Sequence, residues 1–221
     1  MHNVVNNLIS IETELKIKIK EINLENYNPN IIAVSKTFAI KDILPLINYG
    51  HIHFGENKVQ EAVEKWTDIK NNFHNIKLHM IGKLQTNKVK YVIPLFDYIH
   101  SVDNLKLAEK ISNEQVKKNK IMKLFIQINT GNENQKSGIL IDDLGSFYNV
   151  CKKDLGLNII GLMCLPPNNS KSSVHFNKMH ELAKKIKLKE ISMGMSNDYL
   201  NAINYKATYL RIGSKIFGER N

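Results

Sequence analysis

The stretch "IIAVSKTFAI", residues 31–40, begins the repeating pattern that decides the fold. An apolar, β-branched run leads into a polar pair, Ser35 and Lys36, and a helical pattern follows. Such a run is typical of a buried parallel strand that passes into a loop, so Lys36 should lie at the carboxyl end of a strand. An isolated lysine at such a place usually only extends its methylene groups over the core and its ammonium group into water. The rest of the chain has to decide its role.

The same strand-to-helix unit recurs along the chain. Strand candidates fall at 31–35, 51–54, 77–81, 97–101, 123–128, 158–163, 190–194 and 208–212. Segments with helical spacing separate them, and an amphipathic helix is expected within residues 1–25. This alternation predicts a single α/β domain over residues 1–221. The count of eight strands favours a closed (β/α)8 TIM-type barrel over an open doubly wound sheet.

Composition limits the class of protein further. Of the 221 residues, 43% are hydrophobic, which is enough for a full-sized core. No apolar run approaches the ~20 residues that cross a bilayer, and the first residues lack a signal-peptide pattern. We therefore expect a cytoplasmic protein with no membrane partner. Cys151 and Cys164 cannot form a disulfide framework, and they lack the spacing of a zinc or redox site.

The net charge of +10 raises the question of a nucleic-acid partner. The lysines are spread through helical segments such as "EQVKKNKIMK" and "ELAKKIKLKE" and are not gathered into one aromatic-rich strip. Charges distributed in this way usually belong to solvated helix faces. We expect no nucleic-acid partner, although a basic nucleic-acid-binding module stays an alternative.

Polar motifs follow most of the predicted strands, where barrel enzymes carry their active sites. They are "SKT" at 35–37, "HFGEN" at 53–57, "HMIGKLQTNK" at 79–88, "NTGNENQKSG" at 129–138, "GLMCLPP" at 161–167, "SMGMSND" at 192–198 and "RIGSKIFGER" at 211–220. Loops after the last two strands of such barrels commonly bind phosphate, and here Gly213 and Ser214 could offer backbone amides beside the Ser196 hydroxyl. Lys36 across the mouth would then form a Schiff base with a phosphorylated aldehyde.

In their order and spacing, these motifs resemble the pyridoxal phosphate homeostasis protein family, the single-domain relatives of the barrel half of alanine racemase. The resemblance extends over nearly the whole chain and implies pyridoxal phosphate (PLP) as cofactor. It also implies the following roles: Lys36 as the Schiff-base lysine, Asn57 in the cofactor pocket, Ser196, Gly213 and Ser214 at the phosphate, and Arg211 facing the pyridine nitrogen.

The chain also departs from the family pattern. The segment after "GLMCLPP" is short, and His175 stands before Phe176 where relatives often carry an arginine. Position 214 is serine where threonine is frequent, a change that keeps the hydroxyl group and the backbone amide. Lys136 matches a loop lysine associated with cofactor handling in some relatives. We expect the phosphate site to survive these changes.

The resemblance implies a cofactor carrier or buffer in PLP and amino-acid homeostasis, with no catalytic residues and with PLP-dependent apoenzymes as potential recipients. A guanidinium group does not readily give up a proton, so Arg211 should keep the pyridine nitrogen unprotonated and the ring a poor electron sink. Racemisation also needs a second acid/base, which alanine racemase takes from another domain and from its dimer partner. A low-activity racemase or transaminase and, more weakly, a Schiff-base aldolase remain alternatives. A closed barrel leaves no open strand edge, which favours a monomer.

Two histidines raise the question of a metal site. We expect His53 and His79 to end neighbouring strands, but no third ligand with suitable spacing accompanies them. We therefore expect no metal ion, and we expect these side chains to form hydrogen bonds around the cofactor mouth.

Overall fold

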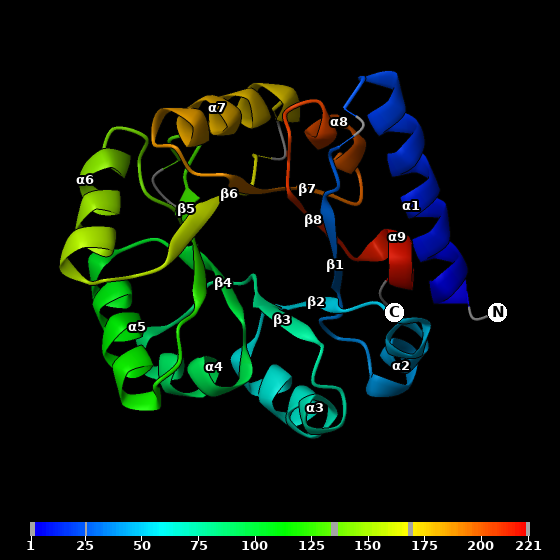
Figure 1. Ribbon diagram of the computed structural model, residues 1–221, viewed down its shortest axis with the longest axis horizontal. Helices are drawn as coiled ribbons and strands as arrows, with labels where there is room; N and C mark the ends of the chain where they lie inside the picture. The colour runs from blue at the N-terminus through cyan, green and yellow to red at the C-terminus, as the bar shows by residue number, and fades with distance from the viewer. Residues whose placement is uncertain (1–2, 25, 134–136, 168–169, 220–221) are drawn as a thin grey trace.

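The computed structural model describes residues 3–24, 26–133, 137–167 and 170–219. Over these residues, β1 to β8 form one closed barrel in sequence order (Figure 1). The strands are β1 Asn30–Val34, β2 His53–Glu56, β3 Lys77–Met80, β4 Tyr98–Val102, β5 Lys123–Ile128, β6 Ile159–Cys164, β7 Glu190–Met195 and β8 Tyr209–Ile212. β8 pairs in parallel with β1, which closes the sheet. The predicted barrel is confirmed.

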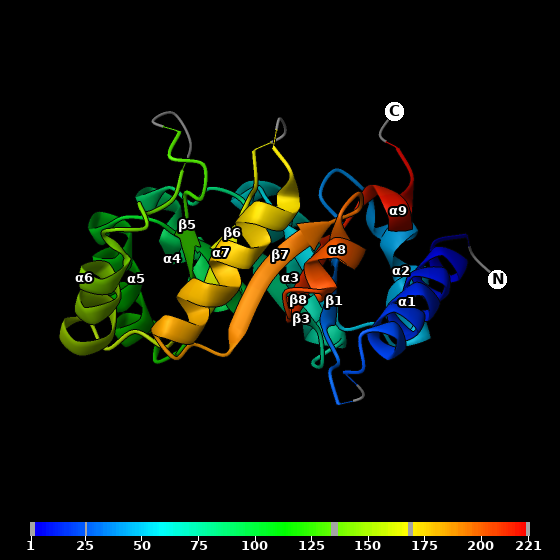
Figure 2. The same cartoon turned by 90° about the horizontal axis from the view of Figure 1, so that it is seen from above.

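Helices surround the barrel on its outer side (Figures 1 and 2). They are α1 Asn3–Glu21, α2 Ile40–Tyr49, α3 Val59–Asn72, η1 Thr86–Lys88, α4 Val89–Leu95, α5 Leu105–Lys118, α6 Leu144–Asn149, η2 Val150–Asp154, α7 Ser172–Lys185, α8 Tyr199–Ile203 and α9 Ser214–Phe217. Their apolar faces bury against the outward side chains of the strands. Trp66 of α3, for example, is fully buried against Phe54 of β2, with 4.9 Å between the ring centroids.

The lumen of the barrel holds a second, smaller apolar cluster. Its buried members are Ile32, Tyr98, Phe125, Met163 and Tyr209. This separation follows from the alternation of side chains along a strand, because neighbours of an inward residue point outward. On β1, Ile32 lies in the lumen cluster while Ile31 and Ala33 belong to the outer core.

The expected N-terminal helix is present as α1 and packs beside α2, α8 and α9 (Figure 1). Four apolar residues of α1 are buried: Val5, Leu8, Ile11 and Leu15. Polar contacts fix the helix to α9, because Glu14 lies 2.7 Å from the Lys215 ammonium group and Asn7 donates to the Ile216 carbonyl. No helix in the described part of the chain is both long and apolar enough to cross a membrane.

The predicted bounds of the second strand were wrong by two residues. β2 runs from His53 to Glu56, so His53 begins the strand instead of lying near its end. Glu56 continues the strand although it is fully buried, because its Oε1 atom accepts hydrogen bonds from Ser35, Lys65 and Trp66 at 2.8–2.9 Å. A buried carboxylate with several donors is tolerated in a strand, and a rule that ends strands at charged residues misses it.

Candidate functional site

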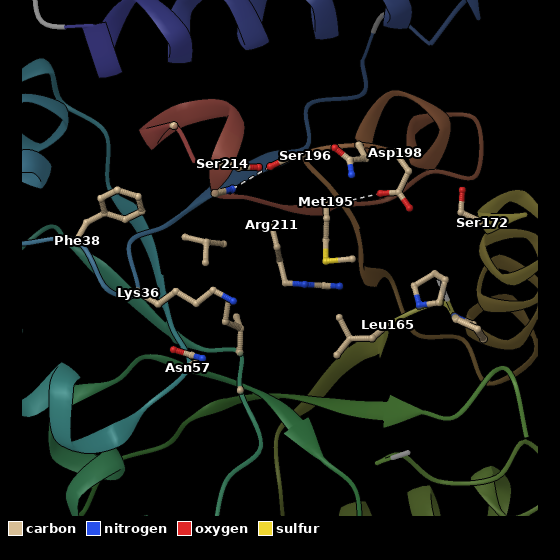
Figure 3. A pocket seen from close by; sticks show the side chains of 18 of the residues that line it. Lys36, Phe38, Asn57, Leu165, Ser172, Met195, Ser196, Asp198, Arg211 and Ser214 are labelled. Carbon is tan, nitrogen blue, oxygen red and sulfur yellow. Dashed lines mark hydrogen bonds between the residues drawn. The ribbon is translucent and has the colours of Figure 1, made fainter. Parts of the chain in front are cut away.

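A pocket of about 610 Å³ opens at the carboxyl ends of the strands. Residues from the ends of β1, β2, β3, β6, β7 and β8 line it. The structure brings all six residues expected to hold the cofactor to this pocket: Lys36, Asn57, Ser196, Arg211, Gly213 and Ser214. Figure 3 shows the Lys36 and Arg211 side chains projecting into the same space, with Ser196 and Ser214 close together at its edge.

Two charged residues of α3, Glu61 and Lys65, anchor the loop that carries Lys36. Its neighbour Thr37 has a φ of 69°, in the left-handed region that a β-branched residue rarely adopts. The Thr37 backbone amide donates to the Glu61 carboxylate, and the Lys65 ammonium group donates to the Ser35 carbonyl at 2.9 Å. These contacts on both sides of position 36 fix the direction in which the Lys36 side chain leaves the strand.

Asn57 presents an unpaired acceptor at this pocket. Its Oδ1 atom is buried and has no hydrogen-bond partner among the described residues. The backbone of Gly82 packs tightly against Asn57, since a Cβ atom at position 82 would lie 2.3 Å from the Asn57 carbonyl oxygen. Buried polar atoms nearly always have a partner. The unpaired Asn57 Oδ1 atom is therefore suited to accept a hydrogen bond from a ligand in this pocket.

Arg211 lies deeper, on β8, and is only 4% exposed. Its Nη1 atom donates to the Ser192 hydroxyl group at 2.6 Å and its Nη2 atom to the Cys164 carbonyl at 2.8 Å. Burial lowers the pKa of Arg211, but a guanidinium group keeps its proton at neutral pH. The pocket therefore contains a fixed, buried positive group.

At the edge of the pocket formed by the loops after β7 and β8, backbone amides converge on one hydroxyl group. The amides of Gly213 and Lys215 both lie 3.3 Å from the Ser196 Oγ atom. Bonds to a neutral oxygen at this length are weak, and an anionic oxygen would be a better acceptor for the same donors. Sequence reasoning assigned the amides to Gly213 and Ser214 and missed the Lys215 amide, because the folded turn decides which amide of a loop points at a given atom.

The departure at His175 has a structural explanation. His175 is buried, with Nδ1 at 2.9 Å from the Thr130 hydroxyl group and Nε2 at 2.7 Å from the Ser170 hydroxyl group. It therefore joins the loop after β5 to the loop after β6, and Ser170 lines the pocket. Lys136, a further candidate for cofactor handling, lies outside the described residues.

The expectation that His53 and His79 lie around the mouth was wrong. They do form a hydrogen bond with each other, at 2.9 Å, but His53 begins β2 and lines a different cleft at the other end of the barrel. His79 is fully buried in the lumen, stacked on Tyr98. In the part of the chain that the structure describes, no three histidine, cysteine, aspartate or glutamate side chains are grouped so that they could hold a metal ion.

Comparison of the chain with known proteins shows the family to which it belongs. A model of the alanine racemase N-terminal domain matches residues 15–221. A Haemophilus influenzae protein named pyridoxal phosphate homeostasis protein is 36% identical over 99% of this chain and 97% of its own length. The chain belongs to the pyridoxal phosphate homeostasis protein family. A second member, from Escherichia coli, is 30% identical over 100% of this chain and 98% of its own.

Solved structures agree with this family membership. PipY of Synechococcus elongatus, solved with PLP bound, superposes with a TM-score of 0.83 and 29% identity, covering 97% of this chain and 100% of PipY. Clostridium difficile alanine racemase has the same barrel, with a TM-score of 0.74. Its identity is 13%, and the match covers 99% of this chain and 57% of the racemase, so this likeness concerns the fold alone.

Proposed function

We propose that this protein binds PLP as a Schiff base at Lys36 and acts as a carrier or buffer of the cofactor in PLP and amino-acid homeostasis. The observation that carries the proposal is the pocket itself, in which a lysine, a buried arginine and a cluster of backbone amides face the same space. The names of the relatives and the PLP bound in PipY support the same cofactor.

The residues of the pocket fit the functional groups of PLP one by one. The Lys36 amine suits the aldehyde, and the amides of Gly213 and Lys215 with the hydroxyl groups of Ser196 and Ser214 suit the phosphate. When bound, PLP supplies an electrophilic aldehyde and an electron-withdrawing ring. The buried Asn57 acceptor is suited to the ring hydroxyl group. Arg211 would then face the pyridine nitrogen.

We infer further that turnover is slow, because Arg211 acts only as a donor. A guanidinium group donates to the pyridine lone pair without transferring its proton, so the ring nitrogen stays uncharged. An uncharged ring withdraws electrons weakly from a neighbouring carbon–hydrogen bond. A low-activity racemase stays the second candidate, since the barrel is shared with alanine racemase.

Protection and delivery of the cofactor test the carrier function. PLP loaded on the protein should resist alkaline phosphatase and should still reactivate the apo form of a PLP-dependent aminotransferase in the presence of that phosphatase. Free PLP at equal concentration should be hydrolysed before it reactivates the apoenzyme, and PLP mixed with Lys36→Ala should behave as free PLP. Hydrolysis of loaded PLP as fast as free PLP, or failure of the apoenzyme to recover, would contradict a carrier.

Arg211→Glu tests why turnover should be slow. A carboxylate stabilises a protonated pyridine as it would any cation, so the variant should exchange the α-hydrogen of a bound amino acid faster than the unmodified protein. The measurement is α-proton exchange in deuterated water by NMR, on protein shown to retain its cofactor. Arg211→Gln, which removes the guanidinium group without adding a carboxylate, is the control. Enzyme-like exchange by the unmodified protein, or no faster exchange by Arg211→Glu, would remove the physical basis of the non-enzyme hypothesis.

A further inference from the structure

A continuous row of hydrogen bonds crosses the barrel lumen from Arg211 to His53. The successive contacts are Arg211 Nη1 to Ser192 Oγ at 2.6 Å, Ser192 Oγ to His100 Nδ1 at 2.9 Å, His100 Nε2 to His79 Nδ1 at 3.0 Å, and His79 Nε2 to His53 Nδ1 at 2.9 Å. The row thus joins side chains from β8, β7, β4, β3 and β2. We call these four contacts the lumen relay.

The two ends of the lumen relay lie in different cavities. Arg211 lines the mouth pocket. His53 lines a cleft of about 350 Å³ between α1 and the N-terminal ends of β1 and β2. Between them Ser192, His100 and His79 have no exposed surface. The relay is therefore a polar path between the two ends of the lumen.

Arg211 gives the relay a direction. Arginine can only donate, so the Ser192 oxygen accepts from Arg211. Among the described residues, the other partner of the buried Ser192 hydroxyl group is His100 Nδ1, so the hydroxyl hydrogen, which would otherwise be buried without an acceptor, is directed to that atom. A neutral imidazole that accepts at Nδ1 carries its hydrogen on Nε2, so His100 donates to His79. By the same reasoning His79 donates to His53. One donor at the end of the row thus sets the tautomer of three rings.

The imidazoles are held neutral by their surroundings. Burial lowers the pKa of His79 and of His100 well below the usual value, and it lowers the pKa of His53 to about 4. Stacking fixes the ring planes: His79 lies 4.1 Å from Tyr98 and His100 4.2 Å from Phe125, centroid to centroid. The other charged or titratable groups around the relay are His51, Lys70, Lys77, Asp97, Tyr98, Lys123, Cys164, Asp198 and Tyr209. Of these, the Asp198 carboxylate acts on Arg211 from the same pocket without forming an ion pair with it.

This direction matters because Arg211 is a buried cation. None of the ion pairs formed within the described ranges includes Arg211. A buried charge needs compensation by a partner or by oriented dipoles. In the relay every imidazole turns its lone pair toward the arginine and its N–H group away from it. The aligned dipoles therefore stabilise the guanidinium group without placing a carboxylate beside it.

We propose that Ser192, His100, His79 and His53 are positioning residues for Arg211, which form a neutral relay in place of a counter-ion and hold the guanidinium group toward the mouth pocket. A carboxylate in the same place would pair with the arginine and draw it away from a ligand. One N–H group of Arg211 donates to the relay and one to the Cys164 carbonyl, which leaves the others available to a ligand. The link to PLP rests on the proposed function, whereas the relay itself does not.

The tautomers of the buried histidines test the relay without any cofactor. In cofactor-free protein that contains ¹⁵N-labelled histidine, NMR at neutral pH should find His53, His79 and His100 protonated on Nε2 alone. Arg211→Met removes the donor that sets the direction, and His100 should then change at least in part to the Nδ1–H form and donate to Ser192. Different tautomers or charged rings in the unmodified protein, or no change in Arg211→Met, would overturn the proposal.

Ser192→Ala tests the effect on the ligand, with a small change that the fold should tolerate. The variant cuts the contact between Arg211 and His100, and it should bind PLP roughly tenfold more weakly, as expected for a lost hydrogen bond to a charged group. Its visible absorption band should also shift. Tyr98→Phe is the matched control in the same lumen. His100→Asn keeps an acceptor for Ser192, because its amide oxygen can replace Nδ1, but it cuts the contact to His79, so it should lose less affinity than Ser192→Ala and more than Tyr98→Phe. Unchanged affinity in Ser192→Ala, or an equal loss in Tyr98→Phe, would overturn the positioning role.

Discussion

Lys36→Ala is expected to abolish covalent binding of PLP while leaving the barrel folded. Alanine cannot form a Schiff base, and no other residue type replaces an amine in that bond. The backbone at position 36 should keep its course, because the contacts that fix it belong to Ser35 and Thr37. The visible band of the PLP-loaded protein should be absent from the variant, and its thermal unfolding midpoint should stay close to that of the unmodified protein.

The control for Lys36→Ala is a second lysine near the same mouth. Lys83 is exposed and directly follows Gly82, which lines the pocket. Lys83→Ala should bind PLP as the unmodified protein does. A Lys36→Ala protein that keeps a borohydride-stable pyridoxyl group would show that the Schiff base forms elsewhere.

The second large effect concerns the phosphate of the ligand. Pyridoxal, which lacks it, should bind about 10²–10⁴-fold more weakly than PLP, because two charge-assisted hydrogen bonds at ~1.5–3 kcal/mol each are lost. The donors expected to supply them are the amides of Gly213 and Lys215. Equilibrium titration of the visible band with each ligand measures the ratio.

Two serine variants locate this effect. Ser196→Ala should reduce the preference for PLP over pyridoxal, because the Ser196 hydroxyl group lies at the convergence of the two amides. Ser172→Ala should leave the preference unchanged, since Ser172 lines the same pocket from α7, where it accepts a hydrogen bond from Asn201. Equal affinity for the two ligands would move the phosphate site away from this loop.

The barrel could be predicted from the sequence because two signals indicate most of its strands. Most are apolar runs, and most are followed at once by polar loop residues, so both the strand and its end can be recognised. Lys36 and Gly213 could be placed at the mouth for this reason. Since the carboxyl ends of parallel strands meet at one end of a barrel, residues far apart in sequence could be assigned to one pocket.

The interior polar residues could not be predicted in the same way. His79, His100 and Ser192 lie inside the barrel because they satisfy one another, and a pairing across three strands has no local signal. The burial of Glu56 could not be predicted for the same reason, since its hydrogen-bond donors come from the loop after β1 and from α3. A sequence rule that places polar groups in water therefore fails where several of them form a closed network.

The bridge made by His175 was also beyond sequence reasoning. Its two partners, Thr130 and Ser170, lie in different loops, and only the folded chain brings them together. The sequence showed that the position departs from the family pattern, but the reason for that departure is a contact between loops.

Chemical trapping of the cofactor tests the central claim most directly. The purified protein is loaded with PLP, reduced with borohydride and digested, and the peptides are identified by mass spectrometry. The pyridoxyl group should be found on the peptide that contains Lys36, and reduction should remove the visible band. A pyridoxyl group on a different lysine, or a protein that binds PLP without any borohydride-stable adduct, would contradict the account.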